Sequence, residues 1–152
     1  MHLDLISEMK SVGKESVWSS SHDKKIIVWE VNGDNISKQC ELNAHSSKIN
    51  GLVVTSGHVW SCSNDKNLFV WEKDSKMLVK EIANAHNDSI LCAAHLDDLV
   101  FTGSASLCKT LRSWSLSFSS QSLSNGSTSF PLTTSVASNE NLVNQNKNIT
   151  AF

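Results

Sequence analysis

One pattern of residues occurs three times in this chain of 152 residues. Each copy has an apolar start, a small polar stretch, a turn, and a second run that ends in tryptophan. The copies are residues 17–30 (VWSSSHDKKIIVWE), 59–72 (VWSCSNDKNLFVWE) and 100–114 (VFTGSASLCKTLRSW). Their last tryptophans, Trp29, Trp71 and Trp114, are spaced by 42 and 43 residues. A chain that repeats at such an interval folds as a row of similar units stacked on one another.

The second copy shows most clearly what one unit contains. Residues 48–54 form a run typical of a strand, and we expect Ile49 and Val53 on one face of it. Turn residues such as Ser56-Gly57 separate this run from three more. The further strands are predicted at residues 59–63, 68–71 and 77–82. Strands at intervals of about 8–12 residues, with turns between them, indicate an antiparallel all-β meander.

The length of the repeat then predicts the architecture. About 40–45 residues in four strands is the size of one β-propeller blade. The runs at 26–29 and 68–71 are apolar on both faces, as expected for a sheet packed between two others. The sequence therefore predicts an all-β fold of antiparallel four-stranded blades. It predicts an incomplete β-propeller of three to four blades.

The amino-acid composition of the chain changes after the third copy. We assign residues 1–116 to three blades and residues 117–131, which are rich in serine, to a loop or linker. Residues 146–152 (NKNITAF) align with residues 65–71 (DKNLFVW). Residues 132–152 are therefore either a degenerate, truncated fourth repeat or a disordered tail. In the first case, residues 135–137 would form its inner strand and residues 141–143 its second strand.

Charge and composition narrow the function classes. The net charge is −2, so the basic excess of a general nucleic-acid binder is missing. The first ten residues lack the features of a secretory signal, and no apolar run is long enough to span a membrane. The cysteines lack the pairwise spacing of a zinc site (Cys40, Cys62, Cys92 and Cys108). We expect reduced thiols and a cytoplasmic protein, with no nucleic-acid partner.

Four residue types recur at similar offsets in the copies: a His, a Ser or Thr, an Asp and the final Trp. The members are His45, Ser61, Asp65 and Trp71 in the second copy, Ser19, Asp23 and Trp29 in the first, and His86, Thr102 and Trp114 in the third. In the first copy His2 is the sole candidate for the histidine, and it lies one residue further from Ser19 in the sequence than His45 lies from Ser61. In the third copy, residues 106–108 replace the Asp and lengthen the turn by two residues.

These residues resemble the WD-repeat family of β-propellers. The likeness covers residues 1–116 well and the rest of the chain weakly. In that family the four residue types form one hydrogen-bonded network, so the resemblance implies that Ser61 accepts a bond from the Trp71 indole and that His45 links Ser61 to Asp65. We expect the network of the third copy to be incomplete.

The repeated Ser, His and Asp also raise the question of catalysis. A hydrolase triad would occur once, whereas these residues recur in successive copies, as a scaffold would require. A G-x-S-x-G elbow and a Gly-rich phosphate loop are missing from the sequence, and its histidines do not pair at metal-binding spacing. We therefore expect a protein that is not an enzyme, with no catalytic residue, metal site or cofactor.

The resemblance implies a rigid platform whose loops grip other proteins or peptides. Carried over from the family, the contact positions are His22, Lys48, Asn50, Asn64, Ser89 and Leu91. Two function classes stay open. One is a non-catalytic interaction scaffold or adaptor. The other is a fragment of the regulatory propeller of a larger multidomain signalling enzyme, such as a kinase, a nucleotide-exchange factor or an inositol phosphatase.

Three clear repeats are few for a closed ring, which typically needs about 4–8 blades. The sequence leaves three explanations open. The first, which it favours, is that the chain is a fragment of a longer protein. The second is that the chain associates with a copy of itself to complete the ring, and the third is that it is a strained four-blade unit.

Overall fold

The computed structural model describes residues 1–105, 110–118, 132–133 and 136–137. In these residues the regular secondary structure consists of β-strands alone. The first sheet contains β1 (Ile6–Val12), β2 (Ser16–Ser21), β3 (Ile26–Asn32) and β4 (Asn35–Leu42). The second contains β5 (Ile49–Val54), β6 (His58–Ser63), β7 (Leu68–Glu72) and β8 (Leu78–Ile82). The third contains β9 (Ile90–Leu96), β10 (Leu99–Ser104), β11 (Leu111–Trp114) and β14 (Val136–Ala137).

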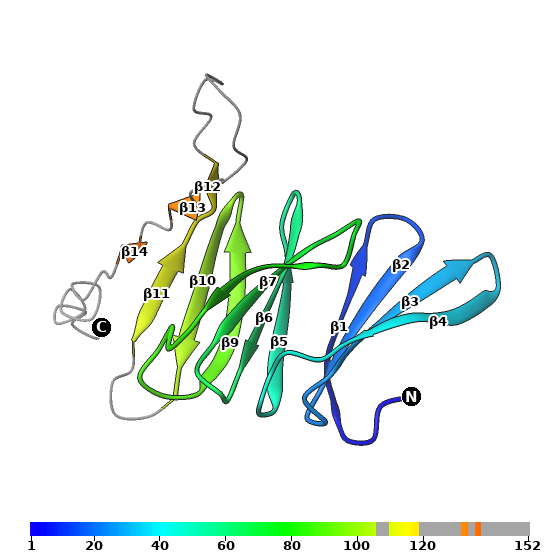
Figure 1. Cartoon of the computed structure of the whole chain (residues 1–152), viewed down its shortest axis with the longest axis horizontal. Helices are drawn as coiled ribbons and strands as arrows, with labels where there is room; N and C mark the ends of the chain where they lie inside the picture. Colours follow the sequence, from blue (N-terminus) through cyan, green and yellow to red (C-terminus); the bar gives the residue numbers. More distant parts are fainter. Residues whose placement is uncertain (106–109, 119–131, 134–135, 138–152) are drawn as a thin grey trace, which may run out of the picture.

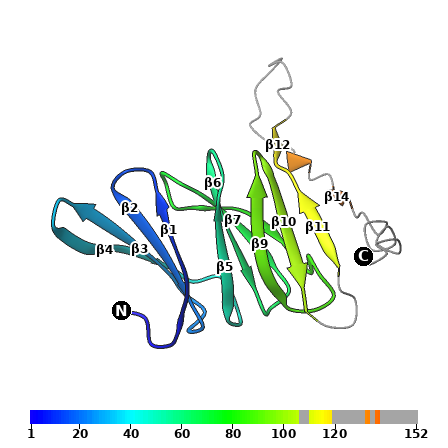
Figure 2. The same cartoon turned by 180° about the vertical axis from the view of Figure 1, so that it is seen from behind.

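All three sheets are antiparallel, and the first two are meanders of four consecutive strands; the third is a meander of β9, β10 and β11 to which β14 adds the outer strand. The three sheets stand side by side and fan outward, as Figures 1 and 2 show from opposite sides. The first strands of the sheets, β1, β5 and β9, are neighbours in space and form the inner edge of the fan. The predicted all-β fold of four-stranded, propeller-like blades is confirmed.

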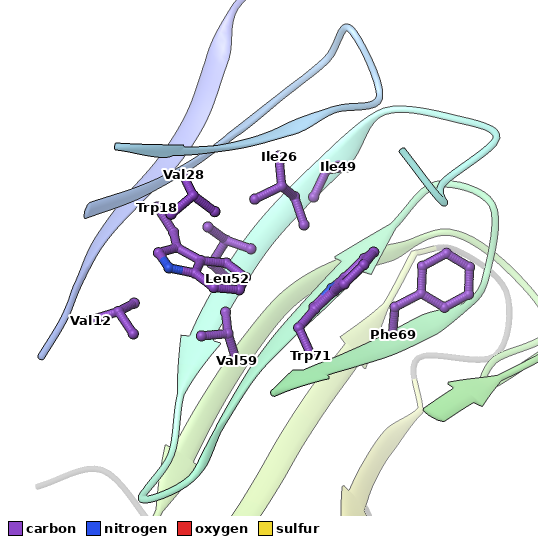
Figure 3. Close-up of a cluster of buried hydrophobic side chains, with 9 residues drawn as sticks. All are labelled: Val12, Trp18, Ile26, Val28, Ile49, Leu52, Val59, Phe69 and Trp71. Atoms are coloured by element: carbon purple, nitrogen blue, oxygen red, sulfur yellow. The ribbon is translucent and has the colours of Figure 1, made fainter. Parts of the chain in front are cut away.

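Two hydrophobic clusters hold the sheets together. We call the face that carries Trp29, Trp71 or Trp114 the front face of its sheet, and the opposite one the back face. The first cluster joins the back face of the first sheet, including Trp18 and Val28, to the front face of the second (Figure 3). The second cluster joins Trp60 and neighbours on the back face of the second sheet to the front face of the third. The apolar runs are thus buried between sheets, which is the dominant favourable term in such a fold.

A β-bulge interrupts the inner strand of every sheet near its start. The residues skipped in the pairing register are Ser7, Asn50 and Leu91. Because one extra residue reverses the alternation of side chains, Ile49 packs in the first cluster and Val53 in the second. The prediction that Ile49 and Val53 share one face was therefore wrong.

The third sheet is completed from a distant segment. Val136 pairs with Trp114 and Ala137 with Ser113, so β14 is the outer strand of this sheet. One of the two interpretations of residues 132–152 makes residues 135–137 the inner strand of a fourth repeat, and for Val136 and Ala137 this position is wrong. The rest of the expected fourth repeat, including 141–143 and 146–152, lies outside the described residues. A separate ribbon pairs β12 (Ser117–Phe118), the first two residues of the predicted linker, with β13 (Leu132–Thr133), which directly follows the linker.

No helix long and apolar enough to cross a membrane is found in the part of the chain that the structure describes.

Candidate functional site

The second sheet carries a chain of hydrogen bonds from an indole to a carboxylate. The Trp71 indole N–H donates to Ser61 Oγ at 3.0 Å, and Ser61 Oγ lies 2.8 Å from His45 Nε2. His45 Nδ1 lies 2.8 Å from Asp65 Oδ2. An ionised carboxylate only accepts, so His45 Nδ1 carries the proton of its hydrogen bond to Asp65. The His45 ring also stacks on Phe69, with centroids 4.2 Å apart.

Asp65 closes the turn between β6 and β7. Its carboxylate accepts the backbone N–H groups of Ser46 at 2.9 Å and Asn67 at 3.0 Å. Burial alone would raise the pKa of Asp65, but the hydrogen bond and charge of His45 and the two backbone donors outweigh it and lower the pKa. The carboxylate therefore binds the loop before β5 to the turn after β6.

The first sheet repeats this arrangement with His2. His2 Nδ1 lies 2.9 Å from Asp23 Oδ2 and Nε2 lies 2.8 Å from Ser19 Oγ, which accepts the Trp29 indole at 2.8 Å. The expectation that His2 is one residue too far away was wrong. The extra residue lies between Met9 and Ser19, in the hairpin at the opposite end of the sheet, and does not displace His2.

In the third sheet a hydroxyl takes the place of the carboxylate. His86 Nε2 lies 2.7 Å from Thr102 Oγ1, which accepts the Trp114 indole at 2.8 Å. His86 Nδ1 lies 3.0 Å from Thr110 Oγ1. The Asp is absent as expected, but the chain of bonds is not interrupted. Burial, together with the positive charge of Arg112, lowers the pKa of His86 to about 4.

The geometry of these three networks fits a role in stabilising the fold. The hydroxyl-bearing residues Ser19, Ser61 and Thr102 are almost fully buried, Ser61 and Thr102 of them between two sheets. Each hydroxyl is engaged on one side by an indole and on the other by an imidazole. A buried hydroxyl with both neighbours in place offers no approach to a substrate, and what the arrangement does is fix a loop to a turn.

The same backbone hydrogen bond recurs three times at the bulge end of the sheets. The backbone N–H of His22 donates to the carbonyl of Leu5 at 2.9 Å. In the same way, the N–H of Asn64 donates to the carbonyl of Lys48 at 2.9 Å, and the N–H of Ala105 to the carbonyl of Ser89 at 2.7 Å. Each bond joins the residue just after a second strand to the residue before an inner strand. We call the surface formed by these loops the rim. All six predicted contact residues lie on it or at its bulges.

Asn50 links two sheets at the rim. Its Nδ2 donates to Asn64 Oδ1 and to the carbonyl of Ile90 in the third sheet, both at 2.6 Å. The Ser89 hydroxyl donates to the carbonyl of Asn64 at 3.4 Å. The structure thus brings three of the six predicted residues, Asn50, Asn64 and Ser89, into one hydrogen-bonded group.

The other three predicted residues surround this group. Leu91, at the bulge of β9, is 54% exposed. Lys48 is exposed and His22 is half-buried. His22 belongs to the rim of the first sheet, so the structure does not place it in the Asn50 group.

Three residues with clear roles were missed by sequence reasoning. Glu8 of β1 reaches into the second sheet, where its Oε2 accepts the backbone N–H of Leu52 at 2.9 Å. Arg112 donates to the carbonyl of Ala85 at 2.6 Å, and Thr110 completes the third network. The repeat offset could not have indicated Thr110, because the turn before it is longer than in the other copies.

Among the residues that the structure describes, no group of three His, Cys, Asp or Glu side chains is placed to hold a metal ion.

The comparisons with known proteins bear on the fold. No family model matches the chain, and no curated protein matches it. Solved structures do match. One is the crystal structure of the computationally designed Ika4 protein, with a TM-score of 0.65 and 22% sequence identity, covering 76% of this chain and 68% of that one. At this identity the likeness shows the fold alone.

Proposed function

We propose that this chain is a WD-repeat-type segment of a β-propeller and acts as a non-catalytic scaffold or adaptor that binds other proteins or peptides. The four-stranded sheets and the His–Ser/Thr–Trp bonds in each of them support the family. The observation that supports binding most directly is the rim, where Asn50 locks the loops of two neighbouring sheets into one surface.

A rigid surface is a good basis for recognition, because little conformational freedom is lost when a partner binds. The Asn50 group fixes the backbone of the second and third sheets at the rim, while Lys48 and Leu91 extend from it. An exposed ammonium and an exposed isobutyl side chain on the same rim suit a protein or peptide that presents both acidic and apolar residues.

We place this function in the reducing interior of the cell. The described cysteines are free thiols, and Cys62 is part of the second hydrophobic cluster. Burial raises the pKa of the Cys62 thiol to about 12, so it behaves as an apolar core residue.

The test is to immobilise the full chain, expose it to cell extract and identify retained proteins by quantitative mass spectrometry. The variant Lys48→Ala/Leu91→Ala removes both projecting side chains and leaves the Asn50 group intact. We expect the amount of each specifically retained protein to be at least about tenfold lower on this variant than on the wild type. A tenfold change corresponds to about 1.4 kcal/mol of binding free energy.

The matched control is Lys14→Ala/Met77→Ala, which makes the same kind of change on exposed residues at the opposite end of the sheets. It should retain the same proteins as the wild type. Equal loss from both variants, or equal retention by both, would contradict binding at the rim.

A further inference from the structure

The back face of the third sheet has the makeup of an inter-sheet interface. In the register of the strands, Leu111 stands where Ile26 and Leu68 stand in the other sheets, opposite Gly103 as they are opposite Ser20 and Cys62. Ile26 and Leu68 are fully buried between sheets, whereas Leu111 is 50% exposed. The exposed large side chains Leu96 and Leu99 pair with each other at the end of the same sheet.

The front face of the first sheet shows the complementary feature. Met9 pairs with Ser19 as Leu52 pairs with Ser61, so Met9 and Leu52 hold equivalent positions. Leu52 is fully buried against the first sheet, whereas Met9 is 56% exposed. Trp29 is half-buried, although Trp71 at the equivalent position is almost fully buried.

From these two faces we propose that a second copy of this chain covers them, and that two chains associate head to tail. The back face of the third sheet in one copy packs on the front face of the first sheet in the other. The argument is continuity with the interfaces already present: twice within the chain, a back face of this makeup is buried by a front face of this makeup. A second copy supplies both missing halves at once.

The symmetry follows from the kind of contact. A back-to-front contact is heterologous, and such contacts close into a ring when their rotation allows it. Two copies of the three four-stranded sheets that the described residues form would make a ring of six blades, within the range of about 4–8 in which propellers close. In this arrangement the inner strands continue around one axis, and each copy uses both faces. The proposal concerns the ends of the fan and does not depend on the binding role of the rim.

The first experiment is sedimentation velocity on the full chain over a wide range of concentrations. We expect a species with twice the mass of the chain. Met9→Glu and Leu111→Glu each place a charge on one of the two faces, and each should halve the observed mass. Both changes are at exposed side chains, so the circular dichroism spectrum of each variant should match the wild type. Met77→Glu is the matched control, exposed on a turn of the second sheet, and should keep the doubled mass.

A mixing experiment distinguishes head-to-tail contact from contact between like faces. The Met9→Glu chain keeps an intact back face on its third sheet, and the Leu111→Glu chain keeps an intact front face on its first sheet. The mixed pair keeps one intact back-to-front contact and carries both charges at the other, so an equimolar mixture should recover the doubled mass with a weaker affinity than the wild type. Two copies joined by like faces would instead leave one of the two variants at the doubled mass on its own.

Each result decides the proposal. A doubled mass that both face variants abolish and their mixture restores supports it. A wild-type monomer at every concentration, a ladder of larger species, or a dimer that survives both substitutions overturns it. In the monomer case, the faces are covered by another protein or by other residues of the same protein. The Lys48→Ala/Leu91→Ala variant should keep the doubled mass, so failure of the scaffold function and failure of this proposal are told apart.

Discussion

Thr110 stands against His86 in the position that a carboxylate holds in the other two sheets. Its hydroxyl lies 3.0 Å from His86 Nδ1, whereas Asp23 and Asp65 lie against His2 and His45 at similar distances. The Thr110 hydroxyl makes the same hydrogen bond to the imidazole as the aspartates do, but it carries no negative charge. His86 is therefore a buried imidazole near the cation of Arg112, with its pKa lowered to about 4.

The substitution Thr110→Asp should raise the pKa of His86. In the wild type, the unfolded chain binds a proton on this residue below about pH 6.5, while the folded chain does not until about pH 4. The stability contributed by neutral His86 is therefore fully present above that unfolded value and is lost as the pH falls toward the folded one. NMR titration of the imidazole measures the pKa directly. Thr110→Asn, which adds no charge, is the control, and an equal shift in both variants would contradict the electrostatic explanation.

Asp65→Ala should lower the free energy of unfolding by about 1–3 kcal/mol, since it leaves buried His45 and two backbone donors without their acceptor. Urea denaturation at neutral pH measures this. Asp74→Ala, an exposed aspartate on the next turn, should change the midpoint little. Asp65 has a lowered pKa in the folded chain, so its contribution is present above the ordinary value near 4 and declines as the pH falls below it. Similar midpoints for the two variants would show that the network is not stabilising.

Glu8→Ala should weaken the coupling between the first two sheets. The Glu8 carboxylate accepts the N–H of Leu52, and its loss leaves that donor facing the space between β1 and β5. We expect the free energy of unfolding from urea denaturation to fall by about 1.5–3 kcal/mol, as for a hydrogen bond to a charged group. Glu8→Gln keeps an acceptor and should recover part of it. Glu15→Ala, an exposed change in the adjoining turn, is the control. A Glu8→Ala variant as stable as the wild type would show that the bond contributes nothing.

Cys62 and Cys92 should differ in reactivity toward iodoacetamide. Burial and the nearby charge of Glu8 raise the pKa of Cys62 to about 12, so it should stay unmodified while the chain is folded. Cys92 is exposed on the back face of the third sheet, in the pair with Gly103. If a second copy covers that face, modification of Cys92 slows as protein concentration rises, and it stays fast in Leu111→Glu. Peptide mass spectrometry resolves the sites, and rapid modification of Cys62 would contradict its burial.

The strands could be predicted from local spacing in the sequence, and the networks from the family that the repeated residues resemble. The strand expected at 68–71 is β7, and Ser61 and Trp71 lie ten residues apart on paired strands, so the repeat itself brings them together. The position of His2 was misjudged because a one-residue insertion was counted without knowing which end of the sheet absorbs it. Val136 was misplaced for a related reason: a strand of two residues carries almost no pattern, and its partner is set by the sheet edge left open at β11.

The bulges at Ser7, Asn50 and Leu91 have one more consequence. A bulged residue lies outside the ladder of paired residues, so its side chain can change without altering which neighbours are buried between the sheets. The three residues at this position differ in chemistry: a hydroxyl, an amide and an aliphatic chain. Each sheet thus has one position where the side chain can differ in chemistry without changing the buried apolar contacts, although at Asn50 a change would also remove the hydrogen bonds to Asn64 and Ile90.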